Sequence, residues 1–439
     1  MSERLRRVSV ADLGPAELPS PLWRGDQDGA GLGRFVPEGR WIRQNIEVRD
    51  GIEPTEDLLF EKAGPRQRLA FDPRNATAAI VTCGGLCPGL NSVVRSLFLE
   101  LHYNYGVPRV LGIRDGYLGL NPTQGPPPIE LNAEFVSSIH KEGGTMLGTS
   151  RGAQAPSVMV DRLQELGVDF FFTVGGDGTQ RGARAIVAEV ADRGARIGVI
   201  GIPKTIDNDL AYCDRTFGFL TAVEEARDVI HLAHTEARAA VRGIGLVKLM
   251  GRYAGFIACA AAVASQETNF CLIPEIPFFL EGRQGFLQAL ETRMAEREHA
   301  VIVVAEGAGQ HLFPADLIKY DRSGNPRLND VGALLKERIV EHFERIENPV
   351  DLKYIDPSYI IRSVAPSCED SLLCDQLARM AAHAAMAGKT DLMIGLVNGA
   401  FVHVPLELAV GPKRQVDPRG NLWAAVMATT GQAERYPGD

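Results

Sequence analysis

Short apolar runs alternate with longer amphipathic stretches along most of this chain of 439 residues. The apolar runs are rich in β-branched and small residues and too short for helices, so each predicts a buried strand. The stretches between them are typical of helices. Strands are expected at 76–83, 109–113, 168–176 and 196–202, and helices at 91–105 and 181–194. This alternation indicates a parallel sheet covered by helices on both faces.

The same pattern begins again after a long predicted helix at 217–241. A second series of strands is expected at 243–251, 269–278, 299–307 and 391–404. A chain of this length has room for two or three domains. We therefore predict an α/β fold with two Rossmann-like three-layer α/β domains. Loops that follow the strands of such sheets are the usual ligand sites.

Residues 1–74 break this pattern, because they are rich in Gly, Pro and charged residues and contain few long apolar runs. We expect them to form an extended arm that lies against the body of the protein or a partner subunit; disorder of the first part is the alternative. We place one α/β domain at 75–218 together with about 363–410. The other is expected at 219–362 together with the C-terminal tail.

Composition narrows the classes of function. The formal net charge of −9 argues against a nucleic acid or an anionic membrane as the main partner. No run approaches the ~20 apolar residues of a membrane span, and the first residues lack the apolar core of a signal peptide. Seven scattered cysteines without zinc-ligand spacing indicate free thiols in a reducing compartment. We expect a cytoplasmic protein.

Two glycine-rich segments follow predicted strands, and the first is VTCGGLCPGLN at 81–91. It places Gly84, Gly85 and Gly89 between a strand and a helix. Backbone amides at the N-terminus of a helix favour phosphate, and glycines let the backbone approach a ligand. The alternative is a tight strand-to-helix turn without a ligand.

The second segment, TVGGDGTQRGA at 173–183, repeats this design. Asp177 lies between glycines at the end of an apolar strand, where a carboxylate can ligate Mg²⁺ directly or through water. Thr179 is positioned to cap the following helix. The alternative makes Asp177 a capping or turn residue. Two such segments on neighbouring strands favour a phosphate ligand over two coincidental turns.

Two arginines lie beside glycine near predicted sheet edges, Arg151 in GTSRG and Arg252 in KLMGR. A single loop arginine usually forms a surface salt bridge. A pair of them in these positions better suits planar recognition of phosphate oxygens.

The segment PKTIDND at 203–209 gathers a lysine, a hydroxyl and two carboxylates where a strand leaves the core. Thr205, Asp207 and Asp209 occupy alternate positions, which in an extended segment places them on one face. Asp207 can accept a proton from a sugar hydroxyl, and Asp209 can orient a metal shell. Thr205 can bond a transferring phosphoryl group, whose charge Lys204 can offset. A turn rich in Asp and Asn, without function, is the alternative.

These motifs follow one another in a fixed order: GGLCPGLN, GTSRG, GGDGT, PKTIDNDL, KLMGR and DPSYIIR. In that order they resemble the 6-phosphofructokinases, from about Phe60 to the C-terminus. LLFEKAGPRQRLAFDP and YIDPSYIIRSVAPS are similar to the long ATP-dependent branch that includes trypanosomatid and plant enzymes. The resemblance implies a magnesium-dependent, allosteric transferase of glycolysis. Such an enzyme phosphorylates the 1-hydroxyl of fructose 6-phosphate with ATP, as a homotetramer or homodimer.

The resemblance also implies a nucleotide-binding role for the first α/β domain and a sugar-phosphate-binding role for the second. Asp207 would be the catalytic base, assisted by Thr205 and Arg252, and Asp177 would serve Mg²⁺. The donor would be held by Gly84, Arg151, Gly152, Gly176, Asp177, Gly178 and Thr179. The sugar phosphate would be held by Thr205, Ile206, Asp207, Met250, Gly251, Arg252, Glu306, Lys353, Tyr359, Ile360, Ile361 and Arg362.

The chain departs from the family pattern at two positions. Gly243 and Lys353 stand where many members carry arginines that reach a neighbouring subunit's sugar site. Arg242 lies beside the first of them but does not occupy it.

Gly178 and Lys204 bear on the choice of phosphoryl donor. Pyrophosphate-using relatives usually carry Asp at the position of Gly178, and its carboxylate would oppose the α-phosphate of ATP. Short bacterial ATP-dependent forms replace the lysine at 204 with glycine. The combination present here is that of the long ATP-dependent branch, so ATP is the expected donor and pyrophosphate the alternative. A silent sugar-phosphate sensor is a further alternative, against which intact Asp177 and Asp207 argue.

Overall fold

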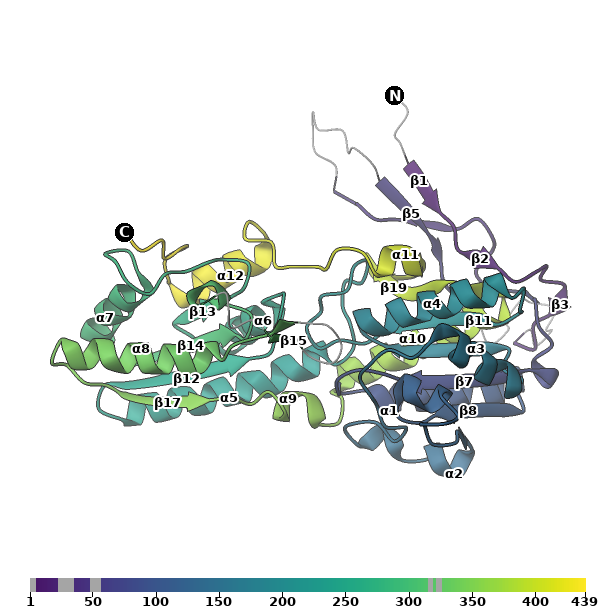
Figure 1. Ribbon diagram of the computed structural model, residues 1–439. Coiled ribbons are helices and arrows are strands. Elements are labelled where there is room, and N and C mark those ends of the chain that lie inside the picture. The colour runs from purple at the N-terminus through teal and green to yellow at the C-terminus, as the bar shows by residue number, and fades with distance from the viewer. Residues whose placement is uncertain (1–4, 23–34, 48–56, 315–318, 321–325) are drawn as a thin grey trace. The chain divides into compact units, whose positions relative to one another are not determined.

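The computed structural model describes residues 5–22, 35–47, 57–314, 319–320 and 326–439. The chain divides into two compact units (Figure 1). The first comprises Met1–Thr205, Leu210–Gly218 and Val364–Pro412, and the second comprises Ile206–Asp209, Phe219–Ser363 and Lys413–Asp439. Each unit is a parallel or mostly parallel sheet with helices packed on it, which confirms the predicted α/β class.

The first unit is built on a sheet whose described strands follow the order β1-β5-β20-β19-β11-β10-β7-β8-β9, with β4 also paired to β5. The last strand of this order, β9, is Ile129–Glu130. Its central strands are β7 (Thr77–Thr82), β8 (Arg109–Ile113), β10 (Phe170–Gly175), β11 (Gly198–Pro203), β19 (Leu392–Val397) and β20 (Ala400–Pro405). From β8 to β19 they run parallel, and β20 returns antiparallel. The carboxyl ends of β7, β10 and β11 therefore share one edge.

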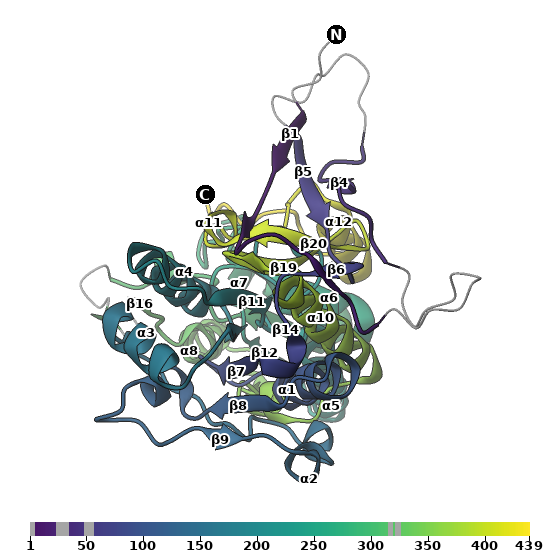
Figure 2. The same ribbon diagram turned by 90° about the vertical axis from the view of Figure 1, so that its right-hand side faces the viewer.

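Helices cover both faces of this sheet, with α3 and α4 on one side and α1 and α10 on the other (Figure 2). Their bounds are α1 (Leu90–Leu99), α3 (Pro156–Glu165), α4 (Asp177–Asp192) and α10 (Cys368–Met386). A π-helical turn, Glu100–Tyr105, continues α1. Side chains alternate between the faces of a strand. Phe171 and Val199 accordingly pack with Ile186 of α4 in one buried cluster.

The described parts of residues 1–74 belong to the first unit and contain short strands. β1 (Leu5–Val8), β4 (Trp41–Arg43) and β5 (Asp57–Lys62) extend the sheet beyond β20. Glu61 of β5 is buried beside Arg66 (2.9 Å), His403 (3.4 Å) and Lys389 (3.5 Å). Burial would raise the pKa of Glu61, but the hydrogen bond and charge of His403, with the two other cations, lower it to about 2. This ion cluster fastens β5 to the sheet.

The second unit contains a parallel sheet of order β13-β14-β12-β17. Its strands are β12 (Gly243–Leu249), β13 (Phe270–Leu272), β14 (Ala300–Ala305) and β17 (Asp351–Ile355). Its helices are α5 (Phe219–Ala239), α6 (Phe256–Ser265), α7 (Phe286–Arg297), α8 (Val331–Arg345), α9 (Ile360–Ser363) and α12 (Asn421–Thr430). Ile244 and Ile302 pack with Phe286 of α7 and Ile339 of α8 in one buried cluster. α5 and α6 pack together and contact the strands as well.

The strand segment 391–404 was counted with the second series of strands, whereas the predicted domain bounds place it, within about 363–410, in the first domain. This segment forms the hairpin of β19 and β20 in the sheet of the first unit. The strands are joined by Asn398 and Gly399, with φ of 50° and 73°. Both residues have the positive φ that a tight two-residue hairpin needs, and Asn-Gly is a strong sequence signal for it.

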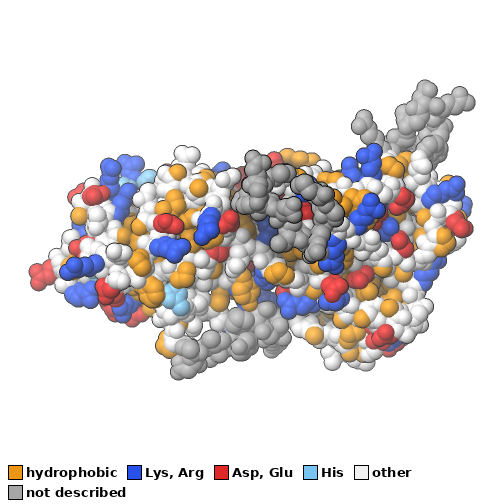
Figure 3. Space-filling model, turned by 90° about the horizontal axis from the view of Figure 1, so that it is seen from above, with side chains coloured by type: hydrophobic (Ala, Val, Ile, Leu, Met, Phe, Trp, Pro, Cys, Tyr) orange, Lys and Arg blue, Asp and Glu red, His pale blue; other side chains and the backbone are white. Residues whose placement is uncertain are grey.

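On the face shown in Figure 3, Lys and Arg side chains are interspersed with Asp and Glu. Among the helices of the described residues, none combines the length and the apolar character that crossing a membrane requires.

Candidate active site

The candidate phosphate-binding residues of the first unit lie in loops at one edge of its sheet. The loops that follow β7, β10 and β11 bring together the first glycine-rich segment, the residues Gly176–Thr179 and the pair Lys204 and Thr205. Ligands of α/β sheets usually bind outside this carboxyl edge. The fold thus gathers residues that the sequence spreads over more than 120 positions.

The loop after β7 is fixed by hydrogen bonds from two other segments. Gly84 has φ of +87°, and a Cβ added there would lie 3.3 Å from Lys204 Nζ. Lys204 Nζ donates to the carbonyl of Gly85 (2.8 Å), and Thr149 Oγ1 donates to the carbonyl of Gly84 (2.7 Å). Glycine is favoured at 84 for two reasons. Other residues rarely adopt its left-handed backbone conformation, and a Cβ would lie close to the ammonium of Lys204.

Arg151 and Gly152 follow Thr149 on an exposed loop of the same unit. Thr82 Oγ1, at the end of β7, donates to the carbonyl of Gly148 (2.8 Å). The loop that carries Arg151 is therefore tied to the end of β7 and to the first glycine-rich loop, while its arginine remains exposed.

The residues Gly176–Thr179 form the start of α4. Gly176 precedes the helix, which begins at Asp177. The expectation that Thr179 caps this helix was wrong, because Thr179 lies inside its first turn and no side chain caps the N-terminus. A Cβ at Gly175 would come within 2.1 Å of Thr179 Oγ1. Thr179 is buried, and its close packing against the strand end explains the glycine at 175.

Asp177 and Gly178 are the accessible residues of this turn. Asp177 forms an ion pair with Arg181, one helical turn later, and its side chain is 16% exposed. A Cβ built at Gly178 meets no heavy atom of the described residues within 4 Å. No cluster of three or more His, Cys, Asp or Glu that could hold a metal occurs in the described chain. Mg²⁺ commonly takes one or two carboxylates together with phosphates and water, so a single carboxylate at Asp177 fits that ion.

The prediction that Thr205, Asp207 and Asp209 share one face of an extended segment was wrong. β11 ends at Pro203, Ile206 and Asp207 form a turn, and Asn208 has φ of 54°. The alternation rule requires extended backbone, which this turn interrupts. Thr205 stays with the first unit, where its carbonyl accepts a hydrogen bond from Thr216 Oγ1 (2.6 Å). Asp207 and Asp209 belong to the second unit.

Asp207 is the most perturbed carboxyl group of the second unit's candidate site. Burial raises its pKa to about 7, and the charges of Asp209 and Glu306 act in the same direction. Lys413 and Arg252 oppose them. A carboxyl group whose pKa lies near neutral pH is suited to accepting a proton during turnover.

Asp209 is held in place by Lys413 and Arg414, which begin the last segment of the second unit. Lys413 Nζ lies 2.6 Å from Asp209 Oδ2, and the backbone amide of Arg414 donates to the carbonyl of Asp209 (2.9 Å). Asp209 is buried. These contacts hold the turn that carries Asp207.

Met250, Gly251 and Arg252 follow β12, beside the end of β14. The amide of Glu306 donates to the carbonyl of Leu249 (2.8 Å), and the amide of Gly307 donates to that of Gly251 (3.1 Å). Gly251 has φ of +133°, which favours glycine there. Burial raises the pKa of Glu306, against the charges of Arg252 and Lys248. Arg252 thus influences both candidate carboxyl groups of this unit.

The candidates near the end of β17 divide by exposure. Tyr359 and Ile360 are 75% and 59% exposed, whereas Ile361 is fully buried. The Ile361 side chain is therefore a core group and leaves only its backbone for a ligand. The Arg362 guanidinium lies 4.9 Å from the centre of the Tyr359 ring. Lys353, on the edge strand β17, pairs with Asp351 (2.9 Å).

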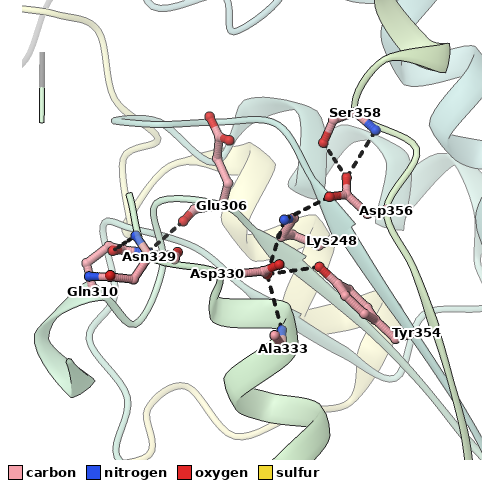
Figure 4. Close-up of polar contacts among 9 residues, drawn as sticks. All are labelled: Lys248, Glu306, Gln310, Asn329, Asp330, Ala333, Tyr354, Asp356 and Ser358. Carbon is pink, nitrogen blue, oxygen red and sulfur yellow. Dashed lines mark hydrogen bonds and ion pairs between the residues drawn. The ribbon is translucent and has the colours of Figure 1, made fainter. Parts of the chain in front are cut away.

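Four charged residues near these groups were missed in the sequence: Lys248, Asp330, Asp356 and Lys413. The first three join in one set of ion pairs, shown in Figure 4. A lysine inside the otherwise apolar run GIGLVKLM was a usable signal, because a charge in a buried strand needs partners. The sequence carries no comparable signal for Lys413.

Comparisons with known proteins agree with one another. The family model described as phosphofructokinase matches residues 77–385. The chain is 47% identical over 409 residues to an ATP-dependent 6-phosphofructokinase of Borreliella burgdorferi, covering 92% of each chain. It is 48% identical over 433 residues to that of Trypanosoma brucei brucei, covering 96% of this chain and 87% of that one. A solved pyrophosphate-dependent phosphofructokinase from Marinobacter aquaeolei matches with a TM-score of 0.66 at 20% identity, covering 83% and 93%. At that identity the likeness shows the fold alone.

Proposed function

The chain belongs to the phosphofructokinase family, and we propose that it is an ATP-dependent 6-phosphofructokinase. It transfers the terminal phosphoryl group of ATP to the 1-hydroxyl of fructose 6-phosphate, giving fructose 1,6-bisphosphate and ADP, a reaction of glycolysis. The structural observation that best supports it is Asp207, a partly buried carboxyl group whose pKa is raised to about 7 against the opposing charge of Arg252.

The first unit supplies the proposed donor site. Backbone amides around Gly84 and Gly176–Thr179 would bind the phosphates of ATP, with Arg151 and Gly152 beside them. Asp177 would hold Mg²⁺, which offsets phosphate charge when bound. The ion pair of Asp177 with Arg181 keeps the carboxylate at the start of α4.

The second unit supplies the proposed acceptor site. Asp207 would accept the proton of the 1-hydroxyl, and Arg252 would stabilise the charge that develops on the transferring group. Glu306 would accept hydrogen bonds from the sugar. Tyr359 and Arg362 would hold its 6-phosphate, for which an exposed ring and a guanidinium stacked beside it are suited.

Two observations favour ATP over pyrophosphate. The space around Gly178 leaves room for a phosphate chain to continue beyond two phosphates. The relatives at nearly half identity over almost the whole chain are named ATP-dependent enzymes. Lys204 is compatible with this choice, because its ammonium is bonded to the carbonyl of Gly85.

We also propose that the enzyme acts in the cytoplasm as a homotetramer or a homodimer, as the resemblance implies. Light scattering after size exclusion decides between the two assemblies. A monomer that turns over at full rate would contradict both.

A comparison of donors tests the proposed function. Product formation from fructose 6-phosphate is measured with ATP and with pyrophosphate at the same free Mg²⁺. The proposal requires turnover with ATP and a higher kcat/KM for ATP than for pyrophosphate. Turnover with pyrophosphate alone would reverse the donor, and no turnover with either would favour a sugar-phosphate sensor.

A further inference from the structure

Lys248 is a charged residue one position before the end of a buried strand. It lies on β12, its neighbours Val247 and Leu249 are fully buried, and its own side chain is 12% exposed. Its ammonium lies 3.1 Å from Asp330 Oδ1 and 2.8 Å from Asp356 Oδ2 (Figure 4). Both carboxylates follow β12 in the sequence, Asp330 directly before α8 and Asp356 directly after β17.

Each carboxylate in turn fixes a piece of backbone. Asp330 precedes α8 and accepts from the amide of Ala333 (3.1 Å), so it caps that helix, and the Tyr354 hydroxyl donates to it (2.9 Å). Asp356 accepts from the amide of Ser358 (3.1 Å) and from its hydroxyl. Lys248 therefore ties the start of α8 to the loop that leaves β17.

Gln310 forms a second connection in the same place. Its side-chain nitrogen donates to the carbonyls of Glu306 (2.9 Å) and Asn329 (3.0 Å). Its oxygen accepts from the amide of Asn329 (3.0 Å). Glu306, at the end of β14, is thereby joined to the residue before Asp330. In Figure 4 the Glu306 carboxylate points away from the Asp330 carboxylate.

Stability alone explains this arrangement poorly. Burying an ammonium costs desolvation, and an apolar side chain would fill the same strand position at least as well. Burial acts to lower the pKa of Lys248, but hydrogen bonds with Asp356, Tyr354 and Asp330 raise it overall, so the group stays charged. The bonds of Lys248 reach Asp356, which binds Ser358 directly before Tyr359. They also reach Asp330, which follows the residue that Gln310 joins to Glu306, just after the end of β14.

We propose that Lys248 is a positioning residue for the sugar-phosphate site, acting through Asp356 on Tyr359 and Arg362 and through Asp330 on Glu306. Lys248 itself does not contact the sugar in this proposal. The inference rests on the proposed function, because it assigns those three residues to the phosphorylated sugar. Its role is to hold the loop after β17 in the shape that receives the 6-phosphate.

Lys248→Met tests the proposal, because methionine keeps most of the volume and removes the charge. Small displacements of positioning groups commonly cost about 10²-fold, and loss of supporting contacts about 10–100-fold. We expect KM for fructose 6-phosphate to rise by about 10–100-fold, with kcat and KM for ATP within about 2-fold of the parent. In an Arg362→Ala background, Lys248→Met should raise KM for fructose 6-phosphate much less. Both substitutions weaken the same interaction with the 6-phosphate, so their effects should not add.

Lys389→Met is the matched control. Lys389 is also 12% exposed and also bridges two carboxylates, Asp12 (2.9 Å) and Glu61 (3.5 Å), but in the first unit. We expect it to lower the melting temperature about as much as Lys248→Met while leaving KM for fructose 6-phosphate unchanged. Asp356→Asn is the milder second variant if Lys248→Met does not fold, and it should raise the same KM.

The outcomes separate the inference from the function on which it rests. A parent that does not phosphorylate fructose 6-phosphate defeats the proposed function. An active parent whose folded Lys248→Met and Asp356→Asn variants keep the parental KM defeats the positioning role. Lys248→Met could instead raise KM equally for both substrates, or its effect could add fully to that of Arg362→Ala. Either result would show that Lys248 has only a structural role.

Discussion

The two units prepare their candidate ligand groups in opposite ways. The first unit offers glycines and exposed side chains at the edge of its sheet, with Gly178 and Arg151 open to solvent. The second unit offers partly buried carboxyl groups whose pKa values are raised, Asp207 and Glu306. Phosphate can be bound by backbone amides that need only room, whereas proton transfer needs a group removed from water and balanced by neighbours. The difference teaches that binding and chemistry place different demands on the same fold class.

The largest effect is expected where the second unit's chemistry is removed outright. Asp207→Asn keeps the size and most hydrogen bonds of the side chain but cannot accept a proton. General-base catalysis contributes about 10²–10⁴-fold, so kcat should fall by that factor with little change in KM for fructose 6-phosphate. Steady-state kinetics on the folded variant measure both constants. A kcat near that of the parent would remove Asp207 from the catalytic role.

The next effect tests whether the open space at Gly178 allows ATP to bind. Gly178→Asp places a carboxylate where the α-phosphate of ATP is expected to pass, and like charges a few ångströms apart cost about 1–4 kcal/mol. We expect kcat/KM for ATP to fall by about 5- to 10³-fold, and any activity with pyrophosphate to fall much less. Gly178→Asn is the neutral control of nearly equal size. If Asn and Asp variants lose ATP activity equally, crowding rather than charge decides the donor.

A smaller effect is expected from the one carboxylate that the first unit contributes. Asp177→Ala should raise the Mg²⁺ concentration needed for half-maximal rate by about 10–100-fold, as loss of metal-site groups commonly does. Binding of fructose 6-phosphate should be nearly unchanged. Arg181→Ala is the companion variant, because it removes the cation that pairs with Asp177 and should not raise the Mg²⁺ requirement. An unchanged titration in Asp177→Ala would make that residue only the first residue of α4.

The smallest effect concerns the balance of charge around Asp207. Its pKa is raised to about 7 by burial, and then by Asp209 and Glu306. The base must be ionised, so kcat/KM should fall as the pH drops through about 7. Asp209→Asn removes one negative neighbour and leaves Lys413 without that carboxylate, and both changes favour the ionised form. The acidic limb of the pH profile should therefore move to lower pH; a move to higher pH would contradict this account.

The comparison of the units also explains what could be predicted from the sequence. Glycine-rich loops and continuous apolar strands are local features, so the strand at 109–113 and the positions of the two glycine-rich loops could be predicted directly. The hairpin at 391–404 follows the second series of strands along the chain but pairs in the first sheet, because strand pairing is not local. Its Asn-Gly turn was visible in the sequence. The turn at Ile206 broke the alternation expected from Thr205 to Asp209.

The charges of the second unit were hardest to predict. Lys413 is more than 200 positions from Asp209, and their contact depends on how the last segment of the chain returns to the second unit. A raised pKa such as that of Asp207 arises from burial, which no single stretch of sequence contains. The motifs indicate candidate residues, and the tertiary structure adds what surrounds them.

The hairpin of β19 and β20 has a consequence for how the protein is made. β19 lies directly beside β11, with Ile200 opposite Leu392, yet the whole stretch Phe219–Ser363 of the second unit is encoded between them. On the ribosome, most of the second unit emerges before β11 can acquire this neighbour. Until then β11 is an open edge of the growing sheet, a geometry prone to pairing with other chains. The first unit is therefore the last to be completed during synthesis, although most of its residues are made first.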